Sequence, residues 1–363
     1  MKRYQGINRE VRPDWAGLVN NILRRGTPDR VFLAELFLDE EVKDAIGARF
    51  DLLPGIEPSD PYYRSKLHVA VQRFLGYDYV SVGLVGVEPE WFRGVADDTA
   101  QLARTGGRGW NDEHHGPIRS WQDFERFPWP QVSSAAAASL EWYSRYVPED
   151  MCLIGWGGFG NLAEWLSNAF GYESLCLALH DERDLVRAVA DRILESSRAA
   201  LQVVLEFDRV KMIWASDDMG FKTQTLLSPP DMRELVLEGH KELAAMSHAA
   251  GRPYLLHTCG NVSQIIDDLV DDVHIDGKHS FEDTIEDVRA AKLSYGRRVA
   301  LLGGIDVDFL CRADESAIRK RVRDTLDTCL EGGGYCLGSG NSVANYIPIA
   351  NYLAMVDEGR LYC

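Results

Sequence analysis

Residues 253–261 read PYLLHTCGN, a short apolar run that ends in a histidine, a cysteine and a glycine. A run of this length with a turn-forming end is typical of a β-strand buried on both faces. Residues two apart on an extended chain point to the same side, so His257 and Cys259 can reach one common ligand. The stretch therefore predicts a buried strand that ends in polar side chains able to bind a ligand.

Seven further apolar runs resemble this one, and helical patterns lie between most of them. Strands that alternate with helices indicate parallel βα units. Eight such units in 363 residues favour a closed (β/α)8 barrel, or TIM barrel, of the α/β class. We expect one such domain over residues 1–363, with a helical extension before the first strand. The other apolar runs cover residues 31–37, 79–84, 152–156, 210–215, 273–275, 299–302 and 334–337, and the helical patterns cover 181–207, 230–250, 261–270 and 316–331.

An open, doubly wound sheet that binds a dinucleotide is the alternative fold. Residues 155–160 read GWGGFG and match the glycine spacing of a dinucleotide-binding loop. That loop is normally followed, about 20 residues later, by an acidic residue at the end of a strand. The corresponding region here has a helical pattern instead, so the barrel is the preferred prediction.

One long segment, residues 86–130, interrupts the alternation after the second predicted strand. It is rich in aromatic residues, including Trp91, Trp110, Trp121 and Trp129, and is too long for a simple loop. We interpret it as an insertion over the barrel mouth. Its aromatic residues either pack the insertion onto the barrel or form the walls of a flat, apolar substrate pocket.

The charge of the chain argues against several classes of partner. The formal net charge is −17 and no basic stripe is evident, so neither nucleic acid nor an anionic membrane is an expected partner. The first residues, MKRYQGINREVRPDW, lack the apolar run of a signal peptide, and no apolar run is long enough to span a membrane. Seven irregularly spaced cysteines indicate free thiols or metal ligands. These features predict a cytoplasmic protein, which can also form a homo-oligomer.

A zinc site is one interpretation of the strand-end residues. The carboxyl ends of barrel strands form the active-site rim, and Cys336, in GGGYCLGSGN, also lies at a predicted strand end. Two thiolates and an imidazole suit tetrahedral Zn²⁺ and leave a fourth position open, as in catalytic zinc sites. The alternative is a buried strand cysteine beside a core histidine, with no metal.

The segments HTCGN and GGYCLGSGN, with the long helices around them, resemble the uroporphyrinogen-decarboxylase-like superfamily, and in particular its cobalamin-dependent methyltransferase branch. The resemblance extends over about residues 29–355. It implies a zinc ion held by a His-x-Cys pair and by a cysteine on the last strand, here His257, Cys259 and Cys336. It also implies a partner protein that carries the corrinoid, because this chain lacks an Asp-x-His-x-x-Gly cobalamin motif.

Two departures distinguish the chain from uroporphyrinogen decarboxylase itself. That enzyme has an R-x-x-G-R motif after its first strand, whereas residues 35–39 here read ELFLD. It also has a Gly-His-Gly turn on its last strand, where this chain has Gly338-Ser339-Gly340. A tetrapyrrole with many carboxylates requires arginines. Decarboxylation of a porphyrinogen is therefore a less favoured alternative.

Six further residues are candidates for the site. Glu282 resembles the acidic residue that binds zinc in methyltransferase relatives, or it lies in the first turn of a helix. Asp217 and Asp218, in an acidic motif that resembles that branch, and Glu35 are candidate catalytic groups that donate a proton or hold the substrate. Their alternative roles are structural. Asn261 and Asn341 follow the ligand segments and either orient the metal ligands or cap helices.

The resemblance implies methyl transfer, in one of two ways. Zinc activates a thiol acceptor that takes a methyl group from methylcobamide, or it assists removal of a methyl group from an ether oxygen. We favour the second, with a methoxylated aromatic donor and the cobalt of a corrinoid protein as acceptor, because the insertion is aromatic and no basic cluster is evident. A barrel that binds a ligand without catalysis is the remaining alternative.

Overall fold

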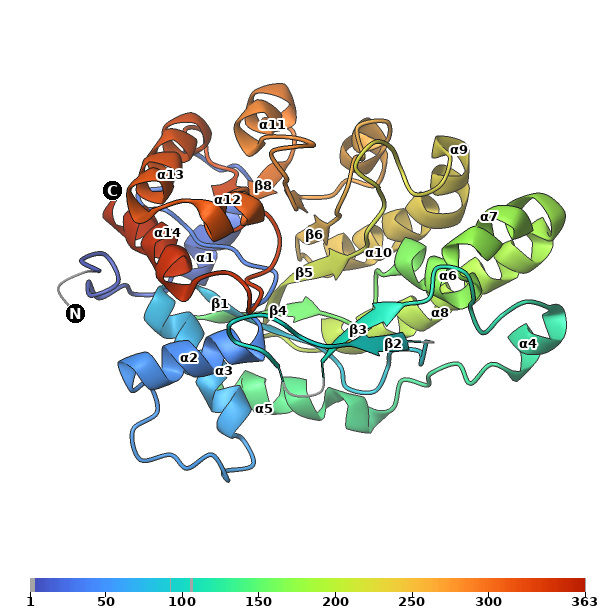
Figure 1. Ribbon diagram of the computed structural model, residues 1–363, viewed down its shortest axis with the longest axis horizontal. Helices are drawn as coiled ribbons and strands as arrows, with labels where there is room; N and C mark the ends of the chain where they lie inside the picture. The colour runs from blue at the N-terminus through green and yellow to red at the C-terminus, as the bar shows by residue number, and fades with distance from the viewer. Residues whose placement is uncertain (1–3, 92, 105–106, 363) are drawn as a thin grey trace.

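Seven parallel strands form one curved sheet in the computed structural model, which describes residues 4–91, 93–104 and 107–362. The strands follow one another in the sheet in the same order as along the chain (Figure 1). This order excludes the doubly wound sheet, in which the strand order reverses. The strands are β1 (Tyr79–Val82), β4 (Cys152–Trp156), β5 (Val210–Ser216), β6 (Tyr254–His257), β7 (Gly277–His279), β8 (Ala300–Leu302) and β9 (Tyr335–Cys336).

The first predicted strand, residues 31–37, closes the sheet between β9 and β1. On one side Leu33 forms a parallel bridge with Leu337, and the N–H of Ala34 donates to the carbonyl of Leu337 at 2.9 Å. On the other side the Tyr79 hydroxyl accepts from the N–H of Glu35 at 2.9 Å and donates to its carbonyl at 2.8 Å. A side chain therefore replaces backbone pairing at one seam, and the predicted (β/α)8 barrel is confirmed.

Helices surround the sheet and pack on it through apolar stripes. The long helix α8 buries residues at helical spacing, such as Leu185, Val189 and Ile193. None of the described helices is both long and apolar enough to cross a membrane. The helical elements are α1 (Trp15–Ile22), α2 (Glu40–Phe50), α3 (Tyr63–Leu75), α5 (Ala138–Tyr146), α6 (Leu162–Phe170), α7 (Tyr172–Asp181), α8 (Arg183–Leu205), α9 (Pro229–Met232), η2 (Arg233–Leu237), α10 (Glu238–Ala249), η3 (Asp268–Asp272), α11 (Val288–Tyr295), α12 (Val307–Arg312), α13 (Glu315–Cys329) and α14 (Ile349–Leu361).

One predicted strand was wrong. Residues 273–275 are apolar because Val273 and Ile275 pack in the core from a loop after η3, and not because they form a strand. His274 between them has a φ of +61°, which is incompatible with an extended strand. The true strand, β7, lies two residues further on and reads Gly-Lys-His, so it carries no apolar signal.

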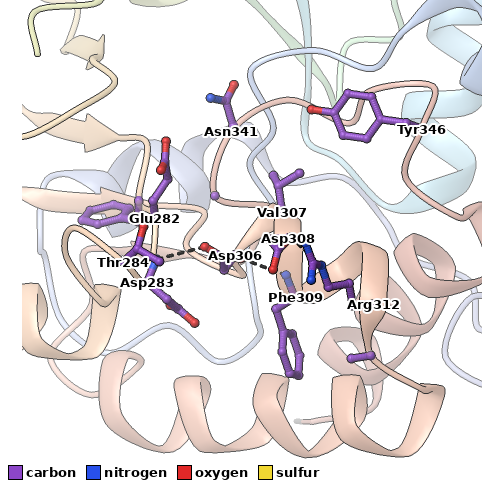
Figure 2. Close-up of a pocket in the computed structure, with 13 residues that line it drawn as sticks. Glu282, Asp283, Thr284, Asp306, Val307, Asp308, Phe309, Arg312, Asn341 and Tyr346 are labelled. Carbon is purple, nitrogen blue, oxygen red and sulfur yellow. Dashed lines mark hydrogen bonds and ion pairs between the residues drawn. The ribbon is translucent and has the colours of Figure 1, made fainter. Parts of the chain in front are cut away.

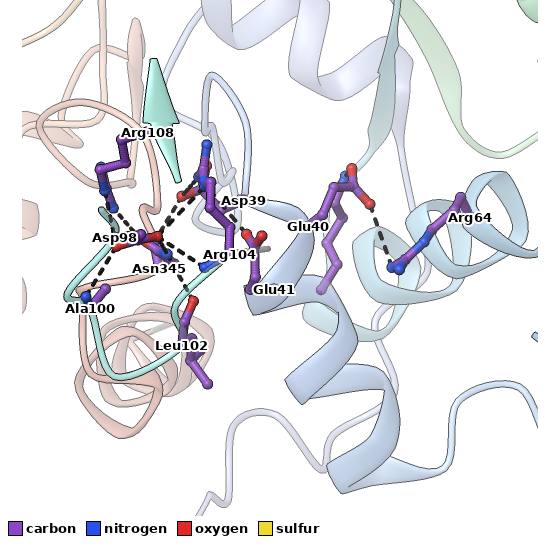
Figure 3. Close-up of polar contacts among 11 residues, drawn as sticks. Asp39, Glu40, Glu41, Arg64, Asp98, Ala100, Leu102, Arg104, Arg108 and Asn345 are labelled. Atoms are coloured by element: carbon purple, nitrogen blue, oxygen red, sulfur yellow. Dashed lines mark hydrogen bonds and ion pairs between the residues drawn. The ribbon is translucent and has the colours of Figure 1, made fainter. Parts of the chain in front are cut away.

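The insertion at residues 86–130 contains a hairpin of β2 (Arg93–Ala96) and β3 (Arg108–Asn111), followed by α4 (Trp121–Arg126). Polar contacts attach it to the carboxyl-end rim of the barrel (Figure 3). Arg104 pairs with Asp39, after the first strand, at 2.6 Å. Asn345, after β9, donates to Asp98 at 2.7 Å and to the carbonyl of Leu102 at 2.8 Å. These contacts join the insertion to the segments that follow the first strand and β9.

The aromatic residues of the insertion lie in two kinds of surroundings. Trp91 stacks on Phe127, with ring centroids 5.4 Å apart, and also contacts Trp165 of α6. Phe127 in turn contacts Trp129 at 4.7 Å. These rings pack the insertion onto the barrel. Trp110 is about half exposed and lines a cavity instead.

The loops after β5 and β6 touch through two glycines. Gly260 has a φ of +81°, and a Cβ atom there would lie 1.9 Å from the carbonyl oxygen of Gly220. Only glycine allows this approach, because any side chain would collide with backbone. The contact holds the ends of β5 and β6 together at the rim.

We expect Gly260→Ala to destabilise the protein more than Gly251→Ala. Both glycines have positive φ, but nothing lies within 4 Å of a Cβ atom at Gly251. Gly251→Ala should cost only the left-handed strain, about 1 kcal/mol. Gly260→Ala adds the clash with Gly220. Urea unfolding of both variants measures the difference, and equal losses would contradict the proposed loop contact.

Candidate metal centre and substrate cavity

Three side chains from two neighbouring strand ends form a cluster that could hold a metal ion. One ligand atom from each of Asp218, His257 and Cys259 lies within 4.8 Å of the other two. Nε2 of His257 is 3.2 Å from Sγ of Cys259 and 3.4 Å from Oδ1 of Asp218. The His257 side chain is buried, whereas that of Asp218 is 46% exposed. The cluster is therefore accessible from the side of Asp218.

The backbone at the ends of β5 and β6 sets this geometry. His257 is the last residue of β6, so Cys259 two residues later lies on the same side. The N–H of Asp217 donates to the carbonyl of His257 at 2.9 Å. The N–H of Cys259 donates in return to Oδ1 of Asp218 at 3.0 Å. These two hydrogen bonds bring Asp218 to the His-x-Cys pair.

The donor atoms of the cluster fit a zinc ion. Burial raises the pKa of the Cys259 thiol, so the thiol stays protonated without a nearby cation. Asn341 Nδ2 and Ser280 Oγ lie 3.2 and 3.4 Å from Sγ and can donate to a thiolate. Burial also acts on Asp218, but hydrogen bonds from His257 and Cys259 outweigh it and lower the pKa. Sulfur, imidazole and carboxylate ligands are typical of zinc, with a fourth position left open.

A second histidine lies beneath the cluster. Nδ1 of His257 is 2.7 Å from Nδ1 of His279 on β7, and both residues are buried. Burial, then the neighbouring His257, lower the pKa of His279, so its ring is neutral. Trp214 packs edge-on against that ring, with centroids 5.2 Å apart. If His257 Nδ1 donates to His279, then His257 Nε2 is free to bind a metal ion. Sequence reasoning missed His279, because it ends a strand without an apolar signal.

A cavity of about 560 Å³ adjoins the cluster on the side of Asp218. Its walls come from the insertion, from α6 and α7, and from the loop after β5. The residues that line it are Trp110, Asp112, Glu113, His114, Glu164, Ser167, Asn168, Tyr172, Asp218, Gly220, Phe221 and Leu226. A cavity of this size accommodates a small aromatic molecule within reach of the cluster. We call it the substrate cavity.

A second cavity, of about 670 Å³, lies near Asn341 and α12 (Figure 2). Most of its carboxylates already have partners. Asp306 accepts from the N–H groups of Asp283 and Phe309 at 2.9 and 2.8 Å. Asp308 pairs with Arg312 at 2.7 Å. None of the three cluster residues lines it, so the smaller cavity is the better candidate for the chemistry.

Glu164 is a further carboxyl group in the substrate cavity that sequence reasoning missed. It lies in the first turn of α6 and accepts from Nδ2 of Asn161 at 2.9 Å. Burial, then the charges of Asp218 and Asp217, raise its pKa to about 8. Its only sequence signal is its place shortly after the glycine-rich stretch 155–160, which is interpretable only once the barrel is known.

Comparison with known proteins agrees with this barrel. The family model for uroporphyrinogen decarboxylase (URO-D) matches residues 115–362. The chain belongs to the URO-D family. A methyltransferase from Methanosarcina mazei has a similar structure, with a TM-score of 0.69 and 19% identity over 96% of this chain and 98% of that one. A B12-independent methionine synthase from Shewanella sp. W3-18-1 gives a TM-score of 0.50 and 11% identity over 82% of this chain and 85% of that one. No curated protein sequence matches significantly.

Two predicted ligands of this URO-D family member lie outside the cluster. Cys336 is fully buried within β9, and its Sγ accepts a hydrogen bond from Nδ2 of Asn21 at 3.4 Å. Its thiol is not among the ligand atoms that gather around Cys259, so it cannot share an ion with Cys259 without rearrangement. Glu282 is exposed and lines the second cavity. Asp218, and not Cys336, shares the cluster with His257 and Cys259.

Two other predicted site residues, Asp217 and Asn261, accept hydrogen bonds from backbone N–H groups. Asp217 is fully buried and accepts from the N–H groups of Ala163 and Glu164 at 2.9 Å each, and it also contacts His240 at 2.9 Å. It therefore anchors the beginning of α6. Asn261 accepts from the N–H and the hydroxyl of Ser263, so it forms a local turn and does not reach the cluster.

Glu35 and Asn341 belong to one buried hydrogen-bonded chain. Oε1 of Glu35 accepts from the N–H of Ser339 at 2.7 Å, and Oε2 lies 2.5 Å from the Ser339 hydroxyl. That hydroxyl is also 3.1 Å from the carbonyl of Asn341, whose side chain contacts Cys259. Glu35 thus acts on the loop that carries Asn341 and does not line the substrate cavity. Burial raises its pKa to about 8.

We expect Glu35→Gln to reduce the pH dependence of stability. The pKa of Glu35 is raised on folding, so its favourable proton is fully present below pH 4.5 and is lost as the pH rises through about 8. Between pH 5 and 8 this group lowers the free energy of unfolding by at most about 1.4 kcal/mol per pH unit. The glutamine side chain keeps an acceptor for Ser339 without titrating. Urea unfolding at pH 5.5, 6.5 and 7.5 tests this, with the exposed Glu141→Gln as control. Parallel pH profiles for the wild type and Glu35→Gln would contradict it.

Proposed function

We propose that this protein is a zinc-dependent methyltransferase that moves a methyl group from a methoxylated aromatic donor to the cobalt of a separate corrinoid protein. The observation that carries the proposal is the cluster of Asp218, His257 and Cys259 at the edge of an aromatic cavity. Its nitrogen, sulfur and oxygen donors with an open side suit catalytic zinc. Zinc, when bound, supplies a Lewis acid for the donor oxygen.

The residues of the cavity have separate roles in this proposal. Trp110, Tyr172 and Phe221 bind the aromatic ring of the donor. The carbon–oxygen bond of the methyl ether breaks, the methyl group goes to the electron pair of reduced cobalt, and the ether oxygen keeps its bonding electrons and takes a proton. Glu164 lines the same cavity as Asp218. It is the carboxyl group that donates this proton to the ether oxygen.

The alternatives receive less support from the same residues. A porphyrinogen needs several arginines for its carboxylates. No arginine lines the substrate cavity, and Arg312 of the second cavity pairs with Asp308. A thiol acceptor that bears a sulfonate would also need a basic group, and no lysine or arginine lines the substrate cavity. A barrel without catalysis does not account for the Cys259 thiol, toward which Ser280 and Asn341 both direct hydrogen-bond donors.

We expect about one zinc ion per chain, and we expect Asp218→Asn and Cys259→Ser to lose it. Cys336→Ser is the matched control and should keep its zinc, because Cys336 lies outside the cluster. Elemental analysis of protein purified without metal-affinity resin gives the content. Zinc loss in Cys336→Ser with retention in Asp218→Asn would restore Cys336 as the third ligand. No zinc in any reduced preparation would contradict the proposed mechanism.

We expect anaerobic incubation with reduced corrinoid protein and a methoxylated aromatic donor to produce methyl-cobalt absorbance and the free phenol. Cys259→Ser should abolish both products, whereas Cys336→Ser should retain them. A parallel incubation with methylcobamide and a thiol tests the other direction of transfer. Methylation of the thiol without demethylation of any ether would favour the thiol methyltransferase alternative.

A further inference from the structure

The substrate cavity has three aromatic walls that come from separate segments. Trp110 lies on β3 of the insertion, Tyr172 begins α7, and Phe221 follows β5. Tyr172 and Phe221 meet edge to face, with ring centroids 5.1 Å apart. The Tyr172 hydroxyl donates to the carbonyl of Leu226 at 2.8 Å, which fixes this wall. Two aromatic faces are therefore held in place before any ligand binds.

A glycine on the opposite strand of the hairpin positions the third wall. Trp110 pairs with Gly94 across β2 and β3. A Cβ atom at Gly94 would lie 2.2 to 2.5 Å from three atoms of the Trp110 indole. The indole therefore lies directly against the backbone of Gly94, in space that a side chain would occupy. This packing fixes the indole at the cavity.

The ionisable side chains of the cavity are mostly acidic. Asp112, Glu113, Glu164 and Asp218 line it, and its lining includes no lysine or arginine. The cavity also includes His114, but this imidazole contacts the Glu173 carboxylate at 2.6 Å, which offsets its charge. Asp218 is assigned to the metal and Glu164, as a protonated group, to the ether oxygen, so the carboxylates of Asp112 and Glu113 remain to attract a cation. An anionic ligand would meet these carboxylates without a lysine or arginine in the lining to pair with.

We propose that the substrate cavity selects a cationic aromatic ligand, an aromatic methyl ether whose ring carries an ammonium group, and rejects aromatic carboxylates. Aromatic faces attract an organic cation through their negative π-surface, and nearby carboxylates add Coulomb attraction. The assignment of a methyl ether rests on the proposed function, whereas the charge preference rests on the cavity alone. The aromatic faces and the carboxyl groups both favour the same ligand charge.

Binding of unreactive probes tests the charge preference without methyl transfer. Benzyltrimethylammonium, benzyl alcohol and benzoate share one ring and differ in charge. Titration calorimetry should show the cation bound about ten-fold more tightly than benzoate at low salt, with benzyl alcohol between them. Added salt should reduce the ratio, because screening weakens attraction between charges. Equal or tighter binding of benzoate would overturn the proposal.

Three variants and one control variant separate the contributions of charge and aromatic surface. Glu113→Gln should weaken the cation and strengthen benzoate, whereas the exposed Glu238→Gln on α10 removes the same charge elsewhere and should leave the ratio unchanged. Trp110→Leu and Gly94→Ala should each weaken the cation several-fold without a change of charge, the second by displacing the indole. An unchanged ratio in Glu113→Gln, or unchanged cation binding in both hairpin variants, would contradict the proposed site.

A comparison of reactive donors then distinguishes failure of this inference from failure of the proposed function. A methoxylated benzylamine and a methoxylated benzoate are supplied to the protein with reduced corrinoid protein. Faster demethylation of the amine, by a lower KM, supports both proposals. Demethylation without charge preference overturns only the cation inference. Charge-selective binding with no demethylation of either donor overturns only the proposed function.

Discussion

The candidate site depends on the hydrogen bond between the N–H of Cys259 and Oδ1 of Asp218, 3.0 Å long. It joins the loops after β5 and β6, and it brings a carboxylate from one strand to the histidine and cysteine of the next. The close approach of Gly220 and Gly260 makes this bond sterically possible. Parallel strands place their carboxyl ends at one rim, so two short loops are enough to assemble three ligands. The barrel brings the three residues to the same rim, and the contact between the two loops brings their ligand atoms close together.

The buried polar groups below the rim support the same site from beneath. His279 contacts His257, and the chain from Glu35 through Ser339 reaches the loop that carries Asn341. A buried carboxyl group costs free energy unless it is hydrogen-bonded or neutral, and Glu35 is both at moderate pH. The buried Glu35 links two parts of the barrel. Its side chain binds Ser339 after β9, and its backbone binds Tyr79 of β1 at the seam.

The sequence predicted the elements whose signals are local. Apolar runs located six of the seven strands of the sheet, and the spacing of His257 and Cys259 placed both at one rim. It failed where the signal depends on tertiary context. Residues 273–275 are apolar because they fill the core from a loop, whereas β7 carries a buried lysine and a histidine and gives no apolar run. Cys336 is a residue type that binds zinc, but only the folded structure shows that its thiol contacts Asn21 and lies outside the cluster. Glu164 comes from a neighbouring helix and is far in sequence from the cluster, so no sequence motif links it to the site.

The substrate cavity combines two kinds of structure with different constraints. Asp218 and Gly220 come from the scaffold, whose geometry is set by the strand ends, whereas Trp110, Asp112 and Glu113 come from the insertion. The insertion is attached to the rim by polar side chains, among them Asp98, Arg104 and Asn345, which lie outside the substrate cavity (Figure 3). Its sequence can therefore change without displacing the metal ligands. An insertion of this kind can change part of the cavity lining while the barrel keeps the cluster of Asp218, His257 and Cys259 in place.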